Sequence, residues 1–290
     1  MRNFITNITM MSSFDLNSFI DRCVQEDVGD GDHSSLACIP ADHVGKAQLL
    51  VKQDGIIAGL SFVAPIFHYF DPATKIEMLI NDGSPIKVGD IAFRVEAKEQ
   101  VLLKAERLIL NILQRMSGIA THTHELTEII KGTKTRLLDT RKTTPGFRYF
   151  EKAAVKLGGG ENHRFGLYDM IMLKDNHVDF AGGIQPAIQK TKAYLKEKGK
   201  NLKIELEVRD FKELEEALQE GGIHRIMLDN FSPADLSKAI QMIDGKYETE
   251  ASGGITKETI RSYAETGVDF ISVGALTHQI QSLDLSLKAI

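Results

Sequence analysis

Charged side chains stand where four short apolar segments of the sequence end. Each segment has the length and composition of a β-strand. The residues at these ends are Asp139 with Thr140, Arg141 and Lys142, then Lys174, Glu207 and Asp229. A charge at the end of an apolar strand is partly desolvated, so it interacts strongly with an opposite charge on a ligand. One such residue reads equally well as a solvated strand end, but the recurrence predicts a site for charged ligands.

Glycines follow the last two predicted strands. One strand leads into Ser252, Gly253 and Gly254, and the other ends at Gly274. Glycines let backbone N–H groups approach an anion at the start of the next helix. Loops after the final strands of a β/α barrel are a favoured phosphate site. The pattern therefore predicts phosphate binding, with an ordinary turn as the alternative.

Positive charge is concentrated in one segment of an acidic chain. The net charge is −5, whereas residues 131–174 hold ten Lys and Arg against four Asp and Glu, a local charge of +6. Nucleic-acid binding usually needs a broad basic face, so a focused cluster favours small anions. A solvated surface with extra lysines is the alternative.

Length and composition limit the class of protein. The chain has 290 residues, 42% hydrophobic, and only two cysteines, Cys23 and Cys38, without a C-x-x-C spacing. This cysteine usage favours a reducing compartment. Residues 1–13 read as a short extension, because they lack the pattern of a signal peptide. No run reaches the roughly 18 apolar residues of a membrane span, so we expect a soluble cytoplasmic protein.

A regular strand-and-helix repeat predicts the element that positions the strand-end residues. Predicted strands start at residues 203, 225, 247 and 269, each 22 residues apart, with helical patterns at 211–219, 233–243 and 257–265 between them. Two earlier strands, 136–139 and 169–173, precede helical patterns at 147–157 and 184–198. This alternation indicates a parallel sheet with helical crossovers. Six such units are too few for a closed eight-unit barrel, so we predict an open, six-stranded parallel β/α barrel.

The N-terminal part has a different pattern. It predicts a helix at 13–27, strands at 46–52, 75–81 and 91–96, and a long helix at 100–130. We therefore expect a sandwich-like α+β domain over residues 14–118 and the barrel over residues 119–278. The last segment, 279–290, is expected to pack back on the first domain. Arg107 lies on the polar stripe of the long helix, which by itself reads as a solvated face.

Eight motifs in order resemble the quinolinate phosphoribosyltransferase family of NAD biosynthesis, also called nicotinate-nucleotide pyrophosphorylase (carboxylating). They are EDVGDGD (26–32), ERLILNILQRMSGIAT (106–121), DTRKTTPG (139–146), GGGENHR (158–164), MLKDNH (172–177), DNF (229–231), SGG (252–254) and GALTH (274–278). The resemblance covers nearly the whole chain after residue 13. One departure is His33-Ser34-Ser35, where family members usually have Thr-Ser; it lies away from the expected chemistry.

The resemblance implies a reaction. Quinolinate and phosphoribosyl pyrophosphate would give nicotinate mononucleotide, pyrophosphate and CO₂ with Mg²⁺, in a homodimer or higher homo-oligomer with shared active sites. No nucleic-acid or membrane partner is expected. The two substrates bring about six negative charges into one cleft, which gives the basic segment a purpose.

The resemblance also assigns roles to residues. Lys142, Lys174, Glu207 and Asp229 would be catalytic. Glu207 and Asp229 would hold the ribose hydroxyls and Mg²⁺. Quinolinate and pyrophosphate would be bound by Arg107, Thr140, Arg141, Lys142, His163, Arg164 and Lys174. The 5′-phosphate would lie against Ser252, Gly253, Gly254 and Gly274, with His278 nearby. In the family, the counterpart of Arg107 enters the neighbouring subunit's site.

Two other functions remain open. A relative of the same fold could transfer phosphoribosyl to another acid, or a regulatory barrel could bind phosphate without catalysis. The strand-end carboxylates argue against the regulatory barrel, because a pure anion sensor gains nothing from acids beside its ligand.

Overall fold

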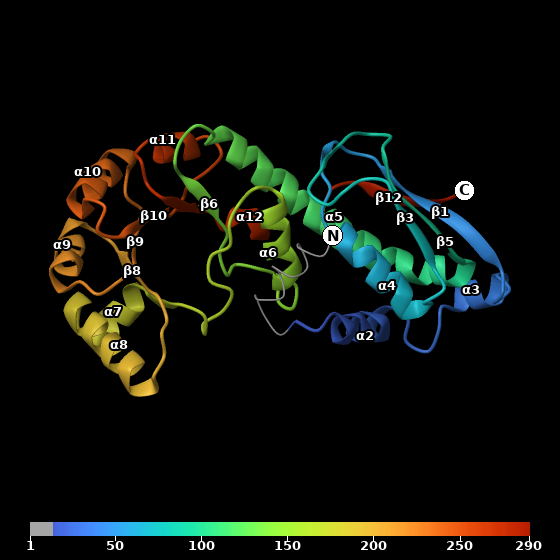
Figure 1. The fold of residues 1–290 in the computed structure, drawn as a ribbon, viewed down its shortest axis with the longest axis horizontal. Coiled ribbons are helices and arrows are strands. Elements are labelled where there is room, and N and C mark those ends of the chain that lie inside the picture. The colour runs from blue at the N-terminus through green and yellow to red at the C-terminus, as the bar shows by residue number, and fades with distance from the viewer. Residues whose placement is uncertain (1–13) are drawn as a thin grey trace. The chain divides into compact units, whose positions relative to one another are not determined.

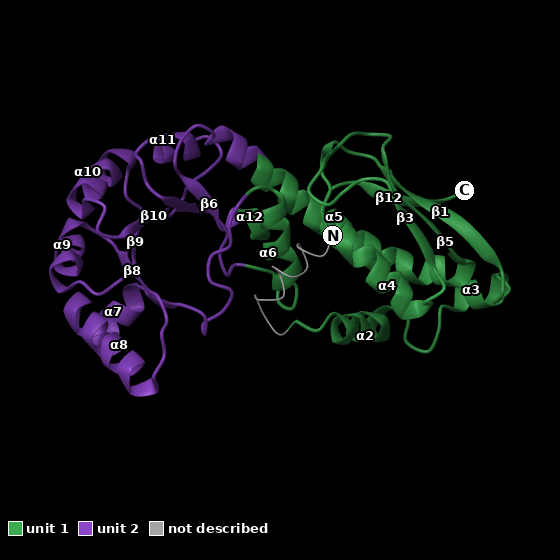
Figure 2. Ribbon diagram, viewed as in Figure 1, with its two compact units in different colours: residues 1–124, 143–159, 276–290 green, residues 125–142, 160–275 purple. Residues whose placement is uncertain are grey.

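A computed structural model describes residues 14–290, and the predicted extension 1–13 lies outside the described residues. The chain forms two compact units, coloured separately in Figure 2. Among the described residues, unit 1 holds 14–124, 143–159 and 276–290. Unit 2 holds residues 125–142 and 160–275. The sequence predicts one domain boundary between residues 118 and 119, whereas each compact unit combines separate segments of the chain.

Unit 1 contains an antiparallel sheet with the strand order β12-β1-β5-β3. These strands are Leu285–Ala289, Val44–Val51, Ile91–Lys98 and Lys75–Met78. Burial alternates along the second half of β1, as expected for a strand with one face on the core. Because β12 pairs with β1 from Leu285 to Ala289, the C-terminal segment is an edge strand of this sheet.

The long helix α5, Glu99–Ile129, begins directly after β5 and supplies core residues of unit 1, among them Ala105, Ile112 and Met116. The C-terminal segment passes close to it at Gly118. A Cβ atom there would lie 2.3 Å from the carbonyl oxygen of Gln281, so only glycine permits this approach.

The other elements of unit 1 are short (Figure 1). They are α2 (Leu16–Asp27), α3 (His33–Cys38), β2 (Gly55–Ile56), η1 (Leu60–Phe62), α4 (Val63–Phe70), β4 (Pro85–Ile86), α6 (Arg148–Leu157) and α12 (Ala275–His278, its first residue in unit 2). Helix α6 joins the unit through aromatic packing. The ring of Phe150 lies 4.8 Å from the rings of both Phe19 and Phe62, which explains why residues 143–159 belong here.

Unit 2 is the predicted six-stranded parallel sheet, in the order β6-β11-β10-β9-β8-β7. Its strands are β6 (Arg136–Leu138), β7 (Ile171–Leu173), β8 (Ile204–Val208), β9 (Arg225–Asp229), β10 (Glu248–Ser252) and β11 (Phe270–Ser272). Strands β6 and β7 are its two edges, so the barrel is open, as the sequence predicts. Side chains alternate between faces, so Ile204, Leu206 and Val208 share one face of β8 while Glu205 and Glu207 share the other.

Helices cover the outside of this sheet (Figure 1). They are α7 (Asp175–Ala181), α8 (Ile184–Lys198), α9 (Phe211–Glu220), α10 (Pro233–Ile243) and α11 (Ile260–Ala264). Two of them begin at N-caps, where the side chains of Asp210 and Ser232 accept hydrogen bonds from backbone N–H groups of the first turn. Helix α7, inserted directly after β7, has no counterpart in the sequence prediction.

Several predicted elements are shorter than expected; the strand predicted at 75–81, for example, is Lys75–Met78. The strand at 169–173 begins only at Ile171, because the carboxylate of Asp169 accepts hydrogen bonds from the backbone of Phe165 and Gly166 and holds a bend. The helix at 257–265 begins at Ile260, after a turn in which Thr259 Oγ1 accepts a hydrogen bond from the Thr256 backbone. Across residues 14–290, no helix combines the length and apolar character that crossing a membrane requires.

Candidate active site

The predicted site residues of unit 2 lie along the side of the sheet where its strands end, because the carboxyl ends of parallel strands lie on the same side. Strand β6 leads into Thr140, Arg141 and Lys142, and strand β7 leads into Lys174. Glu207 lies near the end of β8, and Asp229 is the last residue of β9. Strand β10 ends at Ser252, which precedes Gly253 and Gly254, and Gly274 follows β11. Arg141 and Lys142 are exposed, and the backbone N–H of Lys142 donates to Thr140 Oγ1 over 3.0 Å.

A lysine and two carboxylates meet at the ends of the adjacent strands β7, β8 and β9. Lys174 Nζ donates to Glu207 Oε2 over 2.7 Å, and the Glu207 side chain is only 8% exposed. Burial, and then the negative charge of Glu207, raise the pKa of Asp229, while Lys174 opposes this. The three residues form one electrostatic cluster in which a further cation near Asp229 would be stabilised.

A buried aspartate fixes the segment that carries His163 and Arg164. Asp139 at the end of β6 is fully buried and accepts hydrogen bonds from Asn162 Nδ2 (2.6 Å) and from the backbone N–H of His163 (2.8 Å). Glu161 also forms a parallel bridge to Leu138. The segment therefore runs along β6. The sequence marks Asp139 as a strand-end residue but does not reveal this positioning role.

Two arginines give the site positive potential. Burial lowers the pKa of Arg164, and the positive charge of Arg141 lowers it further. Arg164 Nη1 also donates to the carbonyl oxygen of Met170 over 3.1 Å, which limits its freedom. An anion relieves this repulsion, so the two arginines suit a negatively charged ligand.

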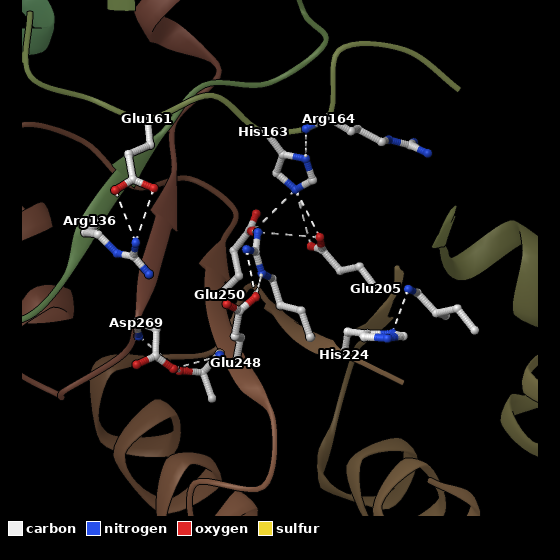
Figure 3. Close-up of polar contacts among 12 residues, drawn as sticks. Arg136, Glu161, His163, Arg164, Glu205, His224, Glu248, Glu250 and Asp269 are labelled. Atoms are coloured by element: carbon white, nitrogen blue, oxygen red, sulfur yellow. Dashed lines mark hydrogen bonds and ion pairs between the residues drawn. The ribbon is translucent and has the colours of Figure 1, made fainter. Parts of the chain in front are cut away.

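His163 points into a buried cluster of charges inside the barrel (Figure 3). Its Nε2 lies 3.1 Å from Glu205 Oε2 and 3.4 Å from Glu250 Oε2, and its Nδ1 accepts a hydrogen bond from the backbone of Arg164 over 2.7 Å. Burial lowers the pKa of His163, but hydrogen bonds and charges from the two glutamates outweigh burial and raise it to about 9. Arg225 Nη1 completes the cluster at 3.0 Å from Glu250 Oε2.

Glu250 and Arg225 are absent from the residues that the sequence singles out. A signal for them exists, because the segments 204–208, 225–229 and 248–252 carry charges two or four residues apart, on one face of each strand. Glu205, Arg225 and Glu250 come from the neighbouring strands β8, β9 and β10. Their clustering requires the strand order, which the sequence alone does not give.

The glycine pair after β10 has a conformation that other residues rarely adopt. Gly253 has φ +98°, Gly254 has φ +61°, and a Cβ atom on Gly253 would lie 2.2 Å from Asn230 Oδ1. Asn230 itself has a positive φ of 57° and donates its backbone N–H to the Ser252 carbonyl over 2.8 Å. The loops after β9 and β10 therefore lie in contact at this edge of the sheet.

Two predicted site residues belong to unit 1. Arg107 is exposed on α5, and His278 is exposed at the end of α12. All other predicted site residues belong to unit 2.

Comparisons with known proteins identify the family. The chain matches the family models "Quinolinate phosphoribosyl transferase, N-terminal domain" over residues 32–117 and "C-terminal domain" over residues 119–288. A quinolinate phosphoribosyltransferase [decarboxylating] from Nicotiana tabacum is 41% identical over 99% of this chain and 86% of its own length. A probable nicotinate-nucleotide pyrophosphorylase [carboxylating] from Bacillus subtilis is 38% identical over 96% of this chain and 94% of its own.

A solved structure agrees with this assignment. The nicotinate-nucleotide pyrophosphorylase from Francisella tularensis is 38% identical, covers 94% of this chain and 95% of its own, and superposes with a TM-score of 0.88. The chain therefore belongs to the quinolinate phosphoribosyltransferase family.

Proposed function

We propose that this protein transfers the phosphoribosyl group of phosphoribosyl pyrophosphate to quinolinate and releases pyrophosphate and CO₂, giving nicotinate mononucleotide for NAD biosynthesis. The observation that carries the proposal is the combination, at one edge of the sheet in unit 2, of basic residues with two strand-end carboxylates. The names of the relatives support the same reaction.

The basic residues suit the anionic groups of both substrates. Arg141 and Arg164, whose guanidinium groups repel each other, would be stabilised by the two carboxylates of quinolinate. His163, Lys174, Thr140 and Lys142 would complete the binding of quinolinate and pyrophosphate. Since the substrates together carry about six negative charges, fixed cations are needed to bring them together.

The strand-end acids suit the reacting ribose. As the bond from the anomeric carbon to pyrophosphate breaks, its electron pair leaves with pyrophosphate and positive charge develops on that carbon. Glu207 and Asp229 would stabilise this charge and hold the ribose hydroxyl groups. The pyridine nitrogen then donates its lone pair to form the new bond to carbon.

Loss of CO₂ needs no dedicated base. Once the ring nitrogen is positively charged, the bond from the adjacent carbon to its carboxylate breaks, the electron pair stays on the ring carbon, and CO₂ leaves. That carbon then takes a proton from water. The protein's part in this step is to hold the carboxylates beside Arg141 and Arg164.

Mg²⁺ fits the pair Glu207 and Asp229. Their mutual repulsion contributes to the raised pKa of Asp229, and such repulsion is relieved by a cation. Mg²⁺ often binds one or two carboxylates together with substrate phosphate oxygens and water. When bound, it would neutralise charge on the departing pyrophosphate.

The glycine-rich loops suit the 5′-phosphate. Ser252, Gly253, Gly254 and Gly274 would bind it through backbone N–H groups and a hydroxyl. His278, which belongs to unit 1, stays a prediction from the family resemblance. The contact between Gly253 and Asn230 keeps this part of the loop close to the strand ends.

Arg107 would act in the active site of a partner subunit. It is exposed on α5, and its side chain forms no hydrogen bond or ion pair with another of the described residues. A homodimer or larger homo-oligomer with shared sites would give this side chain a function.

We also propose that the protein is located in the cytoplasm.

The decisive experiment measures CO₂ released from carboxyl-labelled quinolinate by the purified protein. Release is expected only when phosphoribosyl pyrophosphate and Mg²⁺ are both present. Nicotinate serves as the competing acceptor, because it lacks the carboxylate that is lost. Faster turnover of nicotinate than of quinolinate would contradict the proposal and favour a relative with another acid as substrate.

A further inference from the structure

The barrel interior of unit 2 contains a buried charge cluster that the proposed reaction does not use directly. Glu205 and Glu250 are both fully buried, and one oxygen of each, Oε2 and Oε1 respectively, has no well-formed hydrogen bond within the described chain. Two unpaired carboxylates in such a place would cost several kcal/mol each. Nearby cationic or hydrogen-bond-donating groups are needed to offset this cost.

The groups that compensate the two carboxylates are His163, through its Nε2–H, and the cation Arg225. Arg225 Nη1 lies 3.0 Å from Glu250 and 3.7 Å from Glu205, and its Nε and Nη2 contact Glu248. Its guanidinium also lies 4.0 Å from the centroid of the Phe270 ring. The arginine is thus held on several sides, so its charge is fixed beneath the two glutamates.

A metal ion is the other occupant that this chemistry suits. Side-chain atoms of His163, Glu205 and Glu250 lie within 4.8 Å of one another, the only such group in the part of the chain that the structure describes. A divalent cation there would stand beside the Arg225 guanidinium, which already contacts the same carboxylate oxygens. This repulsion argues for arginine as the resident cation.

The cluster controls the orientation of His163. Its Nε2 faces both carboxylates, as Figure 3 shows, and its Nδ1 accepts from the backbone N–H of the next residue, Arg164. Rotating the ring would break both sets of contacts together. The two glutamates therefore act on two neighbouring residues that the proposed function places at quinolinate.

We propose that Glu250 and Glu205 are positioning residues that fix the His163 imidazole and, through it, the backbone at Arg164, with Arg225 as their permanent counter-ion. The effect on catalysis rests on the proposed function; the orientation of the ring does not. Neither glutamate is expected to touch substrate.

The first test is spectroscopic and needs no substrate. Imidazole ¹⁵N and ¹³C signals of His163 are recorded at one pH in the whole protein, in Glu250→Gln and in the matched control Glu161→Gln. Glu161 precedes His163 by two residues and pairs with Arg136 over 3.2 Å at a half-exposed position. We expect shifted and broadened signals in Glu250→Gln only. Unchanged signals in that variant would overturn the proposal.

The second test is a double-mutant cycle on activity. We expect Glu250→Gln to lower kcat/KM for quinolinate about 10–100-fold, the range typical of residues that orient functional side chains, while Glu161→Gln stays near wild type. Because Glu250 acts through His163, adding Glu250→Gln to His163→Asn should cost little more than His163→Asn alone. Fully additive losses would show that Glu250 has only a general structural role.

Two controls keep the outcomes separate. If Glu250→Gln does not fold, Arg225→Lys, which keeps the charge but loses the forked contact, is expected to shift the same His163 signals.

Metal analysis of the purified protein is expected to find no metal bound at Glu250. A stoichiometric metal that is lost in Glu250→Gln would overturn the role of Arg225. Wild-type protein inactive on quinolinate would refute the proposed function and leave the spectroscopic result standing.

Discussion

At the scale of single residues, the charges inside unit 2 form successive levels along the strands. Arg225 and Glu248 pair near the strand beginnings, His163 lies with Glu205 and Glu250 further along, and Lys174 contacts Glu207 at the strand ends. Residues two apart on a strand share a face and lie about 7 Å apart. The charges of each level therefore act electrostatically on the next level. The negative charges of Glu205 and Glu250 are offset by Arg225 and His163 inside the barrel, below the strand ends that face the ligand.

We predict that Lys142→Ala and Lys174→Ala each lower kcat/KM for quinolinate by about 10²–10³, because each removes a charge-assisted contact to an anionic substrate. Steady-state kinetics measure this, and thermal unfolding checks that the fold is kept. Lys131→Ala is the matched control, since Lys131 forms an exposed pair with Glu128. Near-wild-type rates would mean that these lysines are surface charges.

The raised pKa of His163 predicts a pH-dependent stability. Because the folded-state pKa of about 9 exceeds the usual 6.5, the stabilisation is fully present below about pH 6.5 and is lost as pH rises through 9. It amounts to at most about 3 kcal/mol, since protonating Nδ1 breaks the bond from Arg164. The free energy of unfolding at pH 6 and pH 10, compared with His163→Asn, measures it. A His163 NMR titration near 6.5 would contradict the shift.

Sequence reasoning finds the residues at the strand ends but not those within the strands. Lys174, Glu207 and Asp229 stand out because each interrupts an apolar run. Glu250 lies inside a strand, ETEAS (248–252), that is mostly polar, so the sequence alone does not distinguish it from Glu248. Its partners Glu205 and Arg225 come from other strands, and only the pairing order reveals the cluster.

At the scale of elements, the repeat of strands and helices was enough to predict the open barrel. The 22-residue spacing reflects one strand, one helix and two short loops, and repetition of this unit is typical of a parallel sheet with helical crossovers. The placement of residues 143–159 was not predictable. It depends on Phe150 packing against Phe19 and Phe62, far away in sequence.

At the same scale, Gly253 should not tolerate substitution. In Gly253→Ala the Cβ atom would approach Asn230 Oδ1 to 2.2 Å at a φ of +98°. We expect a loss of about 1–3 kcal/mol in stability and a raised KM for phosphoribosyl pyrophosphate. Gly245→Ala is the control, because Gly245 also has a positive φ but open space around its Cβ position. Equal kinetics for both variants would separate this loop from phosphate binding.

At the scale of the whole molecule, the surface of α5 decides whether one chain suffices for activity. Arg107 is exposed there, and a solvated arginine and an arginine that serves a partner subunit look alike in one chain. The sequence cannot distinguish these two interpretations of Arg107, because the partner surface that it would contact is not encoded in the motif around Arg107. Only an experiment on the assembled protein can do so.

If Arg107 completes the site of a partner subunit, Arg107→Ala should be inactive although its own barrel is intact. Mixing it, after reversible dissociation, with inactive Lys174→Ala should form hybrid dimers. In each hybrid, one site combines an intact barrel with an intact Arg107, and the other carries both lesions. Random reassortment makes about half of the dimers hybrid, so activity should return to roughly one quarter of the wild-type site count. Failure to recover activity, with hybrids confirmed by mass spectrometry, would confine Arg107 to its own subunit or to the solvent-exposed face of α5.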